Sequence, residues 1–182
     1  MAQLWLSMDI KNPMEQNQIA YWQSYMKTKV KAEWENPTAF HITLDFLGED
    51  ETDFEKVEQA MRLFEQNYDK YNQYIFANKI NRFDGGAMWM GVDDSMKLYE
   101  IHYLMREYYK QVGYIPAPSK FEGYTPHITL AYNSPQDFDY SSIKTTKIPL
   151  LVSNVTLWNS FKVNGEYVDN ILYSVDLTKR RL

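Results

Sequence analysis

His41-Ile-Thr-Leu-Asp-Phe-Leu-Gly48 is a short apolar run interrupted by polar side chains. Its first four residues recur 86 residues later as His127-Ile-Thr-Leu130. Successive side chains of a β-strand point to opposite faces of the sheet, so in each copy the histidine and the threonine share one face. The isoleucine and the leucine then pack on the other face. The repeat therefore predicts two strands that present two imidazoles and two hydroxyls to one cleft.

These four side chains suit the cleavage of a phosphodiester without a metal ion. One imidazole takes a proton from the attacking oxygen and the other gives a proton to the leaving oxygen, which the ordinary imidazole pKa of about 6.5 allows near neutral pH. Threonine hydroxyls can donate to the nonbridging phosphate oxygens, where charge builds up. A single histidine on a strand is more often structural. Two copies with the same polar face favour a catalytic set of His41, Thr43, His127 and Thr129.

The segments on either side of the two motifs alternate between strand-like and helix-like patterns. We predict strands at 3–10, 40–46, 74–83, 87–92, 127–132, 148–152, 155–163 and 167–177, and helices at 13–29, 52–68 and 94–111. Thr52 followed by Glu55 predicts a capping box for the second helix. Asn164-Gly165 is typical of a tight hairpin turn between the last two strands. This order indicates an α+β fold in a single domain, residues 1–182.

Composition limits the classes of function. The 182 residues carry a net charge of −5 and include no cysteine, which excludes disulfides, thiolate metal sites and cysteine nucleophiles. The absence of cysteine fits a reducing cytosol, and residues 1–6 show no basic segment before an apolar stretch, so we expect a cytoplasmic protein. No apolar run approaches the ~18 residues of a membrane helix, and we expect no membrane association.

The charge balance also limits the partners. Only small basic groups occur, at 27–31 and 179–181, so we expect no binding of long nucleic acid through its backbone. With three histidines and no spacing typical of metal ligands, we expect neither a metal nor another cofactor. We therefore expect a substrate that is a short nucleotide or the end of a nucleic acid. We also expect the protein to be a monomer.

Further residues are candidates for substrate contact because of their position beside the motifs. Trp5 and Ser7 lie on the polar side of the first predicted strand, where Trp5 can stack a base. Tyr124 and Tyr132 flank the second motif, and Lys120 and Phe121 lie in the loop before it.

Alternation along the strand of the first motif also gives an interpretation of two neighbouring side chains. This alternation places Phe46 in the core with Ile42 and Leu44. It places Asp45 on the face of His41, where Asp45 is either a solvated carboxylate or a carboxylate that orients a histidine. His102 has no following threonine and is interpreted as structural.

The sequence resembles the two-histidine phosphoesterase superfamily, whose signature is a pair of His-x-Thr motifs. Within it, the RNA 2′,3′-cyclic phosphodiesterase or 2′-5′ RNA ligase family is the most similar. The resemblance also covers Gly85-Gly-Ala-Met-Trp-Met-Gly-Val92, Pro126-His-Ile-Thr-Leu-Ala131 and Leu157-Trp-Asn-Ser160. It implies a bilobal α+β fold with two antiparallel-rich sheets and outer helices around a central cleft. It further implies that His41 is the proton donor and His127 the proton acceptor.

One position departs from the family pattern. Many members carry an arginine after the second His-x-Thr-Leu-Ala, and Tyr132 stands there in this chain. Lys120, Lys79, Arg82 or Lys162 can replace that positive charge in space.

The resemblance implies a phosphodiesterase that acts on a ribose 2′-O-linked phosphodiester, either a 2′,3′-cyclic phosphate RNA end or a 2′-5′ linkage. Two alternatives stay open. One is a phage or viral phosphodiesterase that degrades cyclic oligonucleotide messengers of host defence, and the other is a catalytically silent nucleotide-binding module.

Overall fold

The computed structural model describes residues 2–48, 53–69, 72–93, 95–116 and 124–178. Three helices are present in it: α1 (Pro13–Lys27), α2 (Phe54–Asn67) and α3 (Met96–Gln111). The strands are β1 (Ala2–Asp9), β2 (Glu33–Trp34), β3 (His41–Gly48), β4 (Tyr74–Arg82), β5 (Met88–Asp93), β6 (His127–Tyr132), β7 (Ile148–Leu151), β8 (Asn154–Val163) and β9 (Glu166–Asp176). Two 3₁₀ turns, η1 (Pro37–Ala39) and η2 (Tyr140–Ser142), complete the elements. The predicted α+β class is confirmed.

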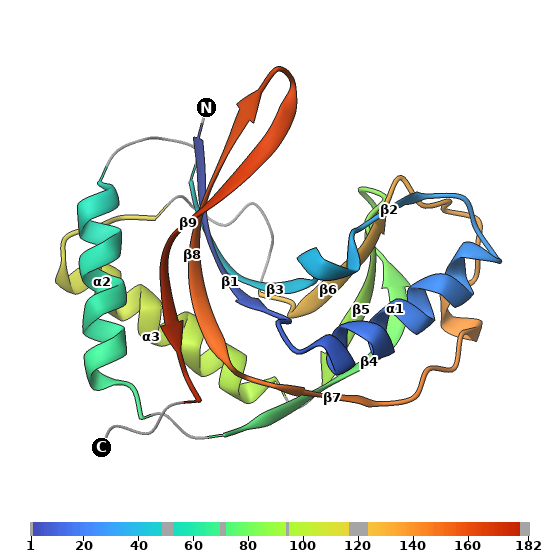
Figure 1. Ribbon diagram of the computed structural model, residues 1–182, viewed down its shortest axis with the longest axis horizontal. Helices are drawn as coiled ribbons and strands as arrows, with labels where there is room; N and C mark the ends of the chain where they lie inside the picture. Colours follow the sequence, from blue (N-terminus) through green and yellow to red (C-terminus); the bar gives the residue numbers. More distant parts are fainter. Residues whose placement is uncertain (1, 49–52, 70–71, 94, 117–123, 179–182) are drawn as a thin grey trace.

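The strands form one curved antiparallel sheet in the order β7-β4-β5-β6-β3-β1-β8-β9, with β2 beside β6 (Figure 1). The two sheets implied by the resemblance are thus joined edge to edge. Their junction is narrow, because the ladder between β3 and β6 consists of the single pair Ile42–Ile128. We call β2, β4, β5, β6, β7 and α1 the β6 half, and β1, β3, β8, β9, α2 and α3 the β3 half.

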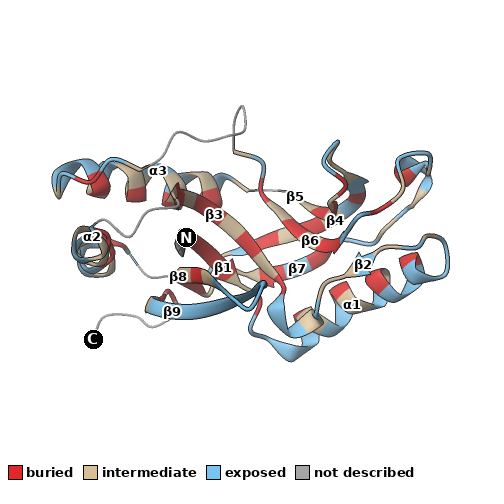
Figure 2. Ribbon diagram, turned by 90° about the horizontal axis from the view of Figure 1, so that it is seen from above, coloured by how far each residue is buried: buried red, intermediate tan, exposed pale blue. Residues whose placement is uncertain are grey.

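The helices pack on the outer side of the sheet (Figures 1 and 2). In the β6 half, the Glu15 carboxylate of α1 accepts a hydrogen bond from the backbone N–H of Leu151, at 2.9 Å. In the β3 half, the Tyr114 hydroxyl, just after α3, donates to the Leu47 carbonyl, and Tyr173 of β9 donates to Glu65 of α2. The buried residues of each helix face the sheet, and the other face of the sheet is left open for a site.

A β-bulge in β3 corrects two predictions. Leu6 pairs with Asp45 and Ser7 with Thr43, so Leu44 is an extra residue and points to the same side as Asp45. The alternation is therefore reversed after Leu44. Asp45 is buried beneath α3, and Phe46, predicted to lie in the core, lines the open face instead.

Most predicted boundaries agree with the structure to within a few residues. At the predicted hairpin turn, Asn164 and Gly165 both have positive φ, at 53° and 90°, as the turn between β8 and β9 requires. The two-residue strand β2 was not predicted, because it is too short to show alternation. Helix α2 begins after Asp53, and the predicted capping residue Thr52 lies outside the described residues. No helix in the described part of the chain is long and apolar enough to span a membrane.

Candidate active site

His41 and His127 are held in the same way. The Nδ1 of His41 lies 2.9 Å from the carbonyl oxygen of Ala39, and the Nδ1 of His127 lies 2.7 Å from that of Thr125. Because a carbonyl oxygen only accepts, Nδ1 carries the proton in both rings. Each Nε2 is therefore free to exchange a proton with a substrate.

The register between β3 and β6 brings the two motifs together. Antiparallel pairing of Ile42 with Ile128 makes the two motifs meet near the starts of their strands. The two histidines therefore precede the same backbone pair, and the charge of His41 acts on His127. All four side chains are partly exposed, whereas Ile42 and Ile128 between them are buried, as the sequence pattern predicted.

Two aromatic rings surround His127. Phe83 packs edge-on against its imidazole with 4.9 Å between ring centroids, and Trp89 lies 6.1 Å away. Burial lowers the pKa of His127 below its ordinary value of 6.5, and the charge of His41 lowers this pKa further. The hydrogen bond to Thr125 acts in the opposite direction. His127 is thereby biased toward the neutral form that accepts a proton.

His41 lies against a stacked tryptophan pair in the β3 half. The ring of Trp5 is 4.8 Å from the His41 ring and stacks on Trp158 at 5.4 Å and 9°. The Trp5 indole donates to Ser160 at 2.7 Å, and the Trp158 indole donates to Ser7 at 2.8 Å. Both rings are thus fixed by hydrogen bonds before any ligand binds.

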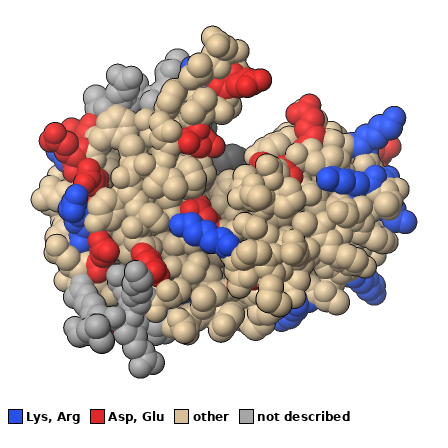
Figure 3. Space-filling model, in the orientation of Figure 1, with Lys and Arg blue, Asp and Glu red and all other residues tan. Residues whose placement is uncertain are grey.

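A cleft of about 520 Å³ opens beside His41 and Thr43. Its walls come from both halves of the sheet and include Trp5, Phe46, Trp158, Tyr132 and Tyr167, together with Gln3, Asp9, Ile10, Lys11, Gln16, Glu35, Thr38, Ala39, Phe40, Ser160, Asp169 and Ile171. Figure 3 shows the hollow between the halves. A volume of this order is typical of a site for a small molecule.

Tyr132 lies in the wall of this cleft. Its hydroxyl interacts with the carboxylate of Glu35 and the hydroxyl of Thr129. Burial of the hydroxyl end raises the pKa of Tyr132, and the charge of Glu35 raises it further. The residue in the place of the family arginine is therefore a neutral phenol in contact with the second motif.

The other predicted contact residues are placed differently. Ser7 is fully buried, and its hydroxyl donates to Asp9, so the predicted direct contact with a substrate has no room here. Tyr124 stacks on His102 at 4.9 Å and is not among the residues that line the cleft. Lys120 and Phe121 lie outside the described residues.

The remaining cationic candidates do not line the cleft either. Arg82 donates to the Ser134 carbonyl, the backbone of Lys79 bonds to Thr145, and the Lys162 ammonium lies over the ring of Tyr167.

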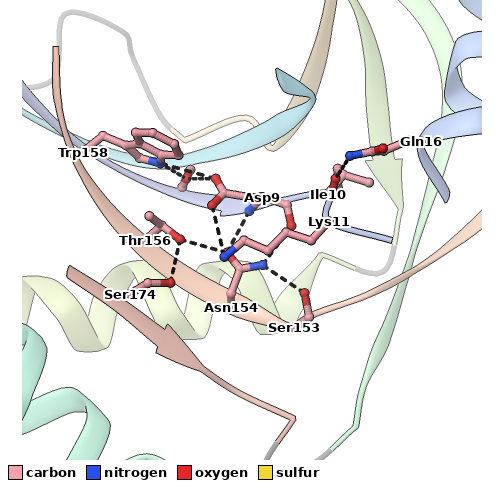
Figure 4. A network of polar contacts seen from close by, with 10 residues as sticks. Asp9, Ile10, Lys11, Gln16, Ser153, Asn154, Thr156, Trp158 and Ser174 are labelled. Carbon is pink, nitrogen blue, oxygen red and sulfur yellow. Dashed lines mark hydrogen bonds and ion pairs between the residues drawn. The ribbon is translucent and has the colours of Figure 1, made fainter. Parts of the chain in front are cut away.

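Lys11 is the one lysine or arginine among the described residues that line the cleft, and sequence reasoning missed it. Its ammonium lies 3.7 Å from the Asp9 carboxylate (Figure 4). The Asp9 carboxylate also accepts hydrogen bonds from the Ser7 hydroxyl and the Trp158 indole. Asp9 alternates with Trp5 and Ser7 along the first strand, and this alternation is the sequence signal that could have placed Asp9 beside the cleft.

Asp45 of β3 and His102 of α3 form a separate cluster where this helix packs on the sheet. Arg106 donates two hydrogen bonds to the Asp45 carboxylate, at 2.7 and 3.0 Å. His102 lies 3.9 Å from Asp45 and its Nδ1 bonds to the Leu44 carbonyl. Asp45 therefore lies near a histidine, but the histidine is His102 rather than His41. Among the described residues, no three histidine, aspartate or glutamate side chains gather in a group that could hold a metal ion.

Comparison with known proteins agrees with this geometry. The curved antiparallel sheet with three helices on its outer side is the fold of a two-histidine phosphoesterase. Residues 16–162 match the model of the 2′-5′ RNA ligase superfamily, and the chain belongs to that family. A search of curated protein sequences found no match.

Solved structures with the same fold share little sequence with this chain. E. coli LigT complexed with 3′-AMP is 19% identical, with a TM-score of 0.72, over 97% of this chain and 98% of that one. The protein TT0787 of Thermus thermophilus is 15% identical, with a TM-score of 0.71 and the same coverage. The MHV ns2 PDE domain is 13% identical, with a TM-score of 0.58 and again the same coverage. These likenesses confirm the predicted fold.

Proposed function

We propose that this protein cleaves a ribose 2′-O-linked phosphodiester by two-histidine acid–base catalysis, without a metal ion. The observation that carries the proposal is the matched anchoring of His41 and His127. Each ring is fixed through Nδ1 by the carbonyl two residues earlier, which leaves Nε2 as the atom of each ring that can exchange a proton with a substrate. A fixed tautomer and a fixed ring orientation are what a general acid and a general base need.

The environment of His127 supports the role that the resemblance implies for it. The lowered pKa of His127 suits the acceptor, which takes a proton from the attacking water. His41 then gives its proton to the ribose oxygen that leaves when its bond to phosphorus breaks. The new P–O bond to the water oxygen gives a phosphate monoester. His127 has then gained one proton and His41 has lost one, so the two rings together carry the same number of protons as before. Thr43 and Thr129 donate to the nonbridging oxygens, where charge increases in the transition state.

The cleft supports a substrate of about nucleotide size. Its volume of about 520 Å³ and its tryptophan pair suit one nucleoside with its phosphate. The structure of E. coli LigT with 3′-AMP shows a nucleoside monophosphate with a protein of the same fold. A 2′,3′-cyclic nucleotide end or a 2′-5′ linkage is the substrate that we propose.

Steady-state kinetics with a 2′,3′-cyclic nucleotide and with a 2′-5′ oligoadenylate test the proposal. We expect turnover that is insensitive to EDTA. The substitutions His41→Ala and His127→Ala should each lower kcat/KM by about 10²–10⁴-fold, the usual contribution of one acid or base. His102→Ala, which removes the histidine on the other side of the sheet, is the matched control and should retain activity.

Two results would contradict the proposal: loss of activity in EDTA, or full activity without either histidine of the pair. A wider panel separates the alternatives. Turnover restricted to cyclic di- or trinucleotides would indicate a messenger-degrading enzyme, and tight binding without turnover of any compound would indicate a silent binding module.

A further inference from the structure

The charges around the cleft are unbalanced. Three carboxylates line it, those of Asp9, Glu35 and Asp169, against the single ammonium of Lys11 among its described lysine and arginine residues. Lys11 is the neighbour of Asp9, so these two charges largely balance one another. No ion pair in the described part of the chain neutralises Glu35 or Asp169. The remaining charge of the cleft walls is therefore negative.

Glu35 is held in place by the β6 half. Its backbone N–H donates to the Leu130 carbonyl at 3.0 Å, and its own carbonyl accepts from the Gln23 amide at 2.7 Å. Gln23 is 1% exposed and also donates to Leu130, so it fixes the chain on both sides of this point. The Glu35 carboxylate is thereby kept beside Tyr132, one contact away from Thr129.

Asp169 approaches from the β3 half. It pairs across the β8–β9 ladder with Ser160, the residue that holds the Trp5 indole. Trp5 in turn contacts His41. The charges of Asp169 and Glu35 both reach Tyr132 and contribute, after burial, to its raised pKa. Acidic side chains are visible on both rims of the hollow in Figure 3.

We infer that this cleft selects nucleotides whose only anionic group is the phosphodiester at the histidines, with Glu35 and Asp169 as specificity-determining residues against any additional phosphate. This inference rests on the proposed function and names its substrate class: a cyclic mononucleotide or nucleotide end with a free 5′-hydroxyl. The reacting phosphate is met by hydroxyl donors and a histidine, and the nucleoside by neutral tryptophan rings. A second phosphate in the cleft meets the carboxylates of Glu35 and Asp169, and Lys11 is the one lysine or arginine among the described residues that line the cleft.

Kinetics on a matched pair of substrates test the inference. Adenosine 2′,3′-cyclic phosphate and its 5′-phosphorylated form differ by a single phosphate group. We expect wild-type kcat/KM to favour the unphosphorylated compound by at least tenfold at low ionic strength. The double variant Glu35→Gln, Asp169→Asn should bring that ratio back toward one, because the repulsion between each carboxylate and the added phosphate is then removed. Added salt should reduce the wild-type ratio as well.

The matched controls are Glu33→Gln for Glu35 and Glu166→Gln for Asp169. Each control residue is an exposed glutamate two or three residues before the carboxylate that it matches, and neither lines the cleft. They should leave the wild-type ratio unchanged. A wild-type ratio near one, or a ratio that the double variant does not change, overturns the inference.

Binding gives a second readout that does not depend on turnover. Trp5 and Trp158 lie in the cleft, so quenching of tryptophan fluorescence can report the occupancy of the site. Wild-type protein should bind adenosine 3′-monophosphate more tightly than adenosine 3′,5′-bisphosphate, and the double variant should lose this preference. Absence of turnover on both cyclic compounds would refute the proposed function, whereas equal affinity of the wild type for the monophosphate and the bisphosphate would refute the charge selection.

Discussion

The ring of Phe83 packs edge-on against the imidazole of His127, with 4.9 Å between their centroids. Phe83 lies just after β4, and it shields the histidine of β6 from water. Burial is the largest cause of the lowered pKa of His127. A residue without any polar side-chain atom therefore helps to keep the proposed proton acceptor neutral.

We expect Phe83→Ala to raise the pKa of His127 toward 6.5, because water then reaches the imidazole. The acid limb of the kcat/KM profile of the wild type should have its midpoint below 6.5, and the substitution should move this midpoint upward. Phe138→Ala, which removes a ring packed on Tyr140, is the control for a general loss of packing. An unchanged acid limb in Phe83→Ala would contradict the role of Phe83.

His41→Asn should also raise the pKa of His127, because the charge of His41 is a further cause of its lowering. The shift should be smaller than the total lowering, since burial remains. NMR titration of the His127 ring protons measures this pKa directly and needs no activity. A pKa that stays constant or falls would show that the two rings are not electrostatically coupled.

The Asp45–Arg106 pair should be important for stability rather than for chemistry. Asp45 is buried, and Arg106→Leu leaves its carboxylate without the two hydrogen bonds, so we expect a loss of about 3 kcal/mol in the free energy of unfolding. The double variant Asp45→Leu, Arg106→Leu should recover much of this loss, because no charge is then buried alone. Urea unfolding of the two single variants and the double variant measures the coupling, and strict additivity would contradict it.

Tyr132→Arg should restore a positive charge beside Thr129. We expect kcat/KM for a 2′,3′-cyclic nucleotide to rise roughly tenfold at low salt, equivalent to about 1.4 kcal/mol of transition-state stabilisation. Glu35 balances part of the new charge and keeps the gain at this modest level. Tyr132→Gln, similar in reach but neutral, should show no gain. Equal rates for the two variants would indicate that charge at this position does not act on the phosphate.

The sequence predicted what depends on local periodicity. Strands β3 and β6 were found from the polar face that their two motifs share, and the β8–β9 turn from Asn164-Gly165. Phe46 and Asp45 were placed wrongly because the extra residue Leu44 reverses the alternation, and a bulge has no distinct signal in one sequence.

The acidic walls of the cleft were missed for a different reason. Glu35 reaches the site through Gln23, which lies 12 residues earlier and on another element, and Asp169 through pairing between β8 and β9. Such positions depend on tertiary contacts, and neither residue belongs to a local pattern. The repeated motif therefore predicted the proposed reaction site, whereas the residues around the substrate could be placed only with the fold.

The single pair Ile42–Ile128 has a mechanical consequence. Because the ladder is narrowest where the two motifs meet, each half of the sheet supplies one histidine and one threonine across a seam with little backbone hydrogen bonding. A phosphate held by all four side chains would act as a clamp over that seam. Substrate binding would then make the junction between β3 and β6 more rigid. The interaction of the four side chains with the phosphate would be strongest in the transition state, when the charge on the phosphate oxygens is greatest.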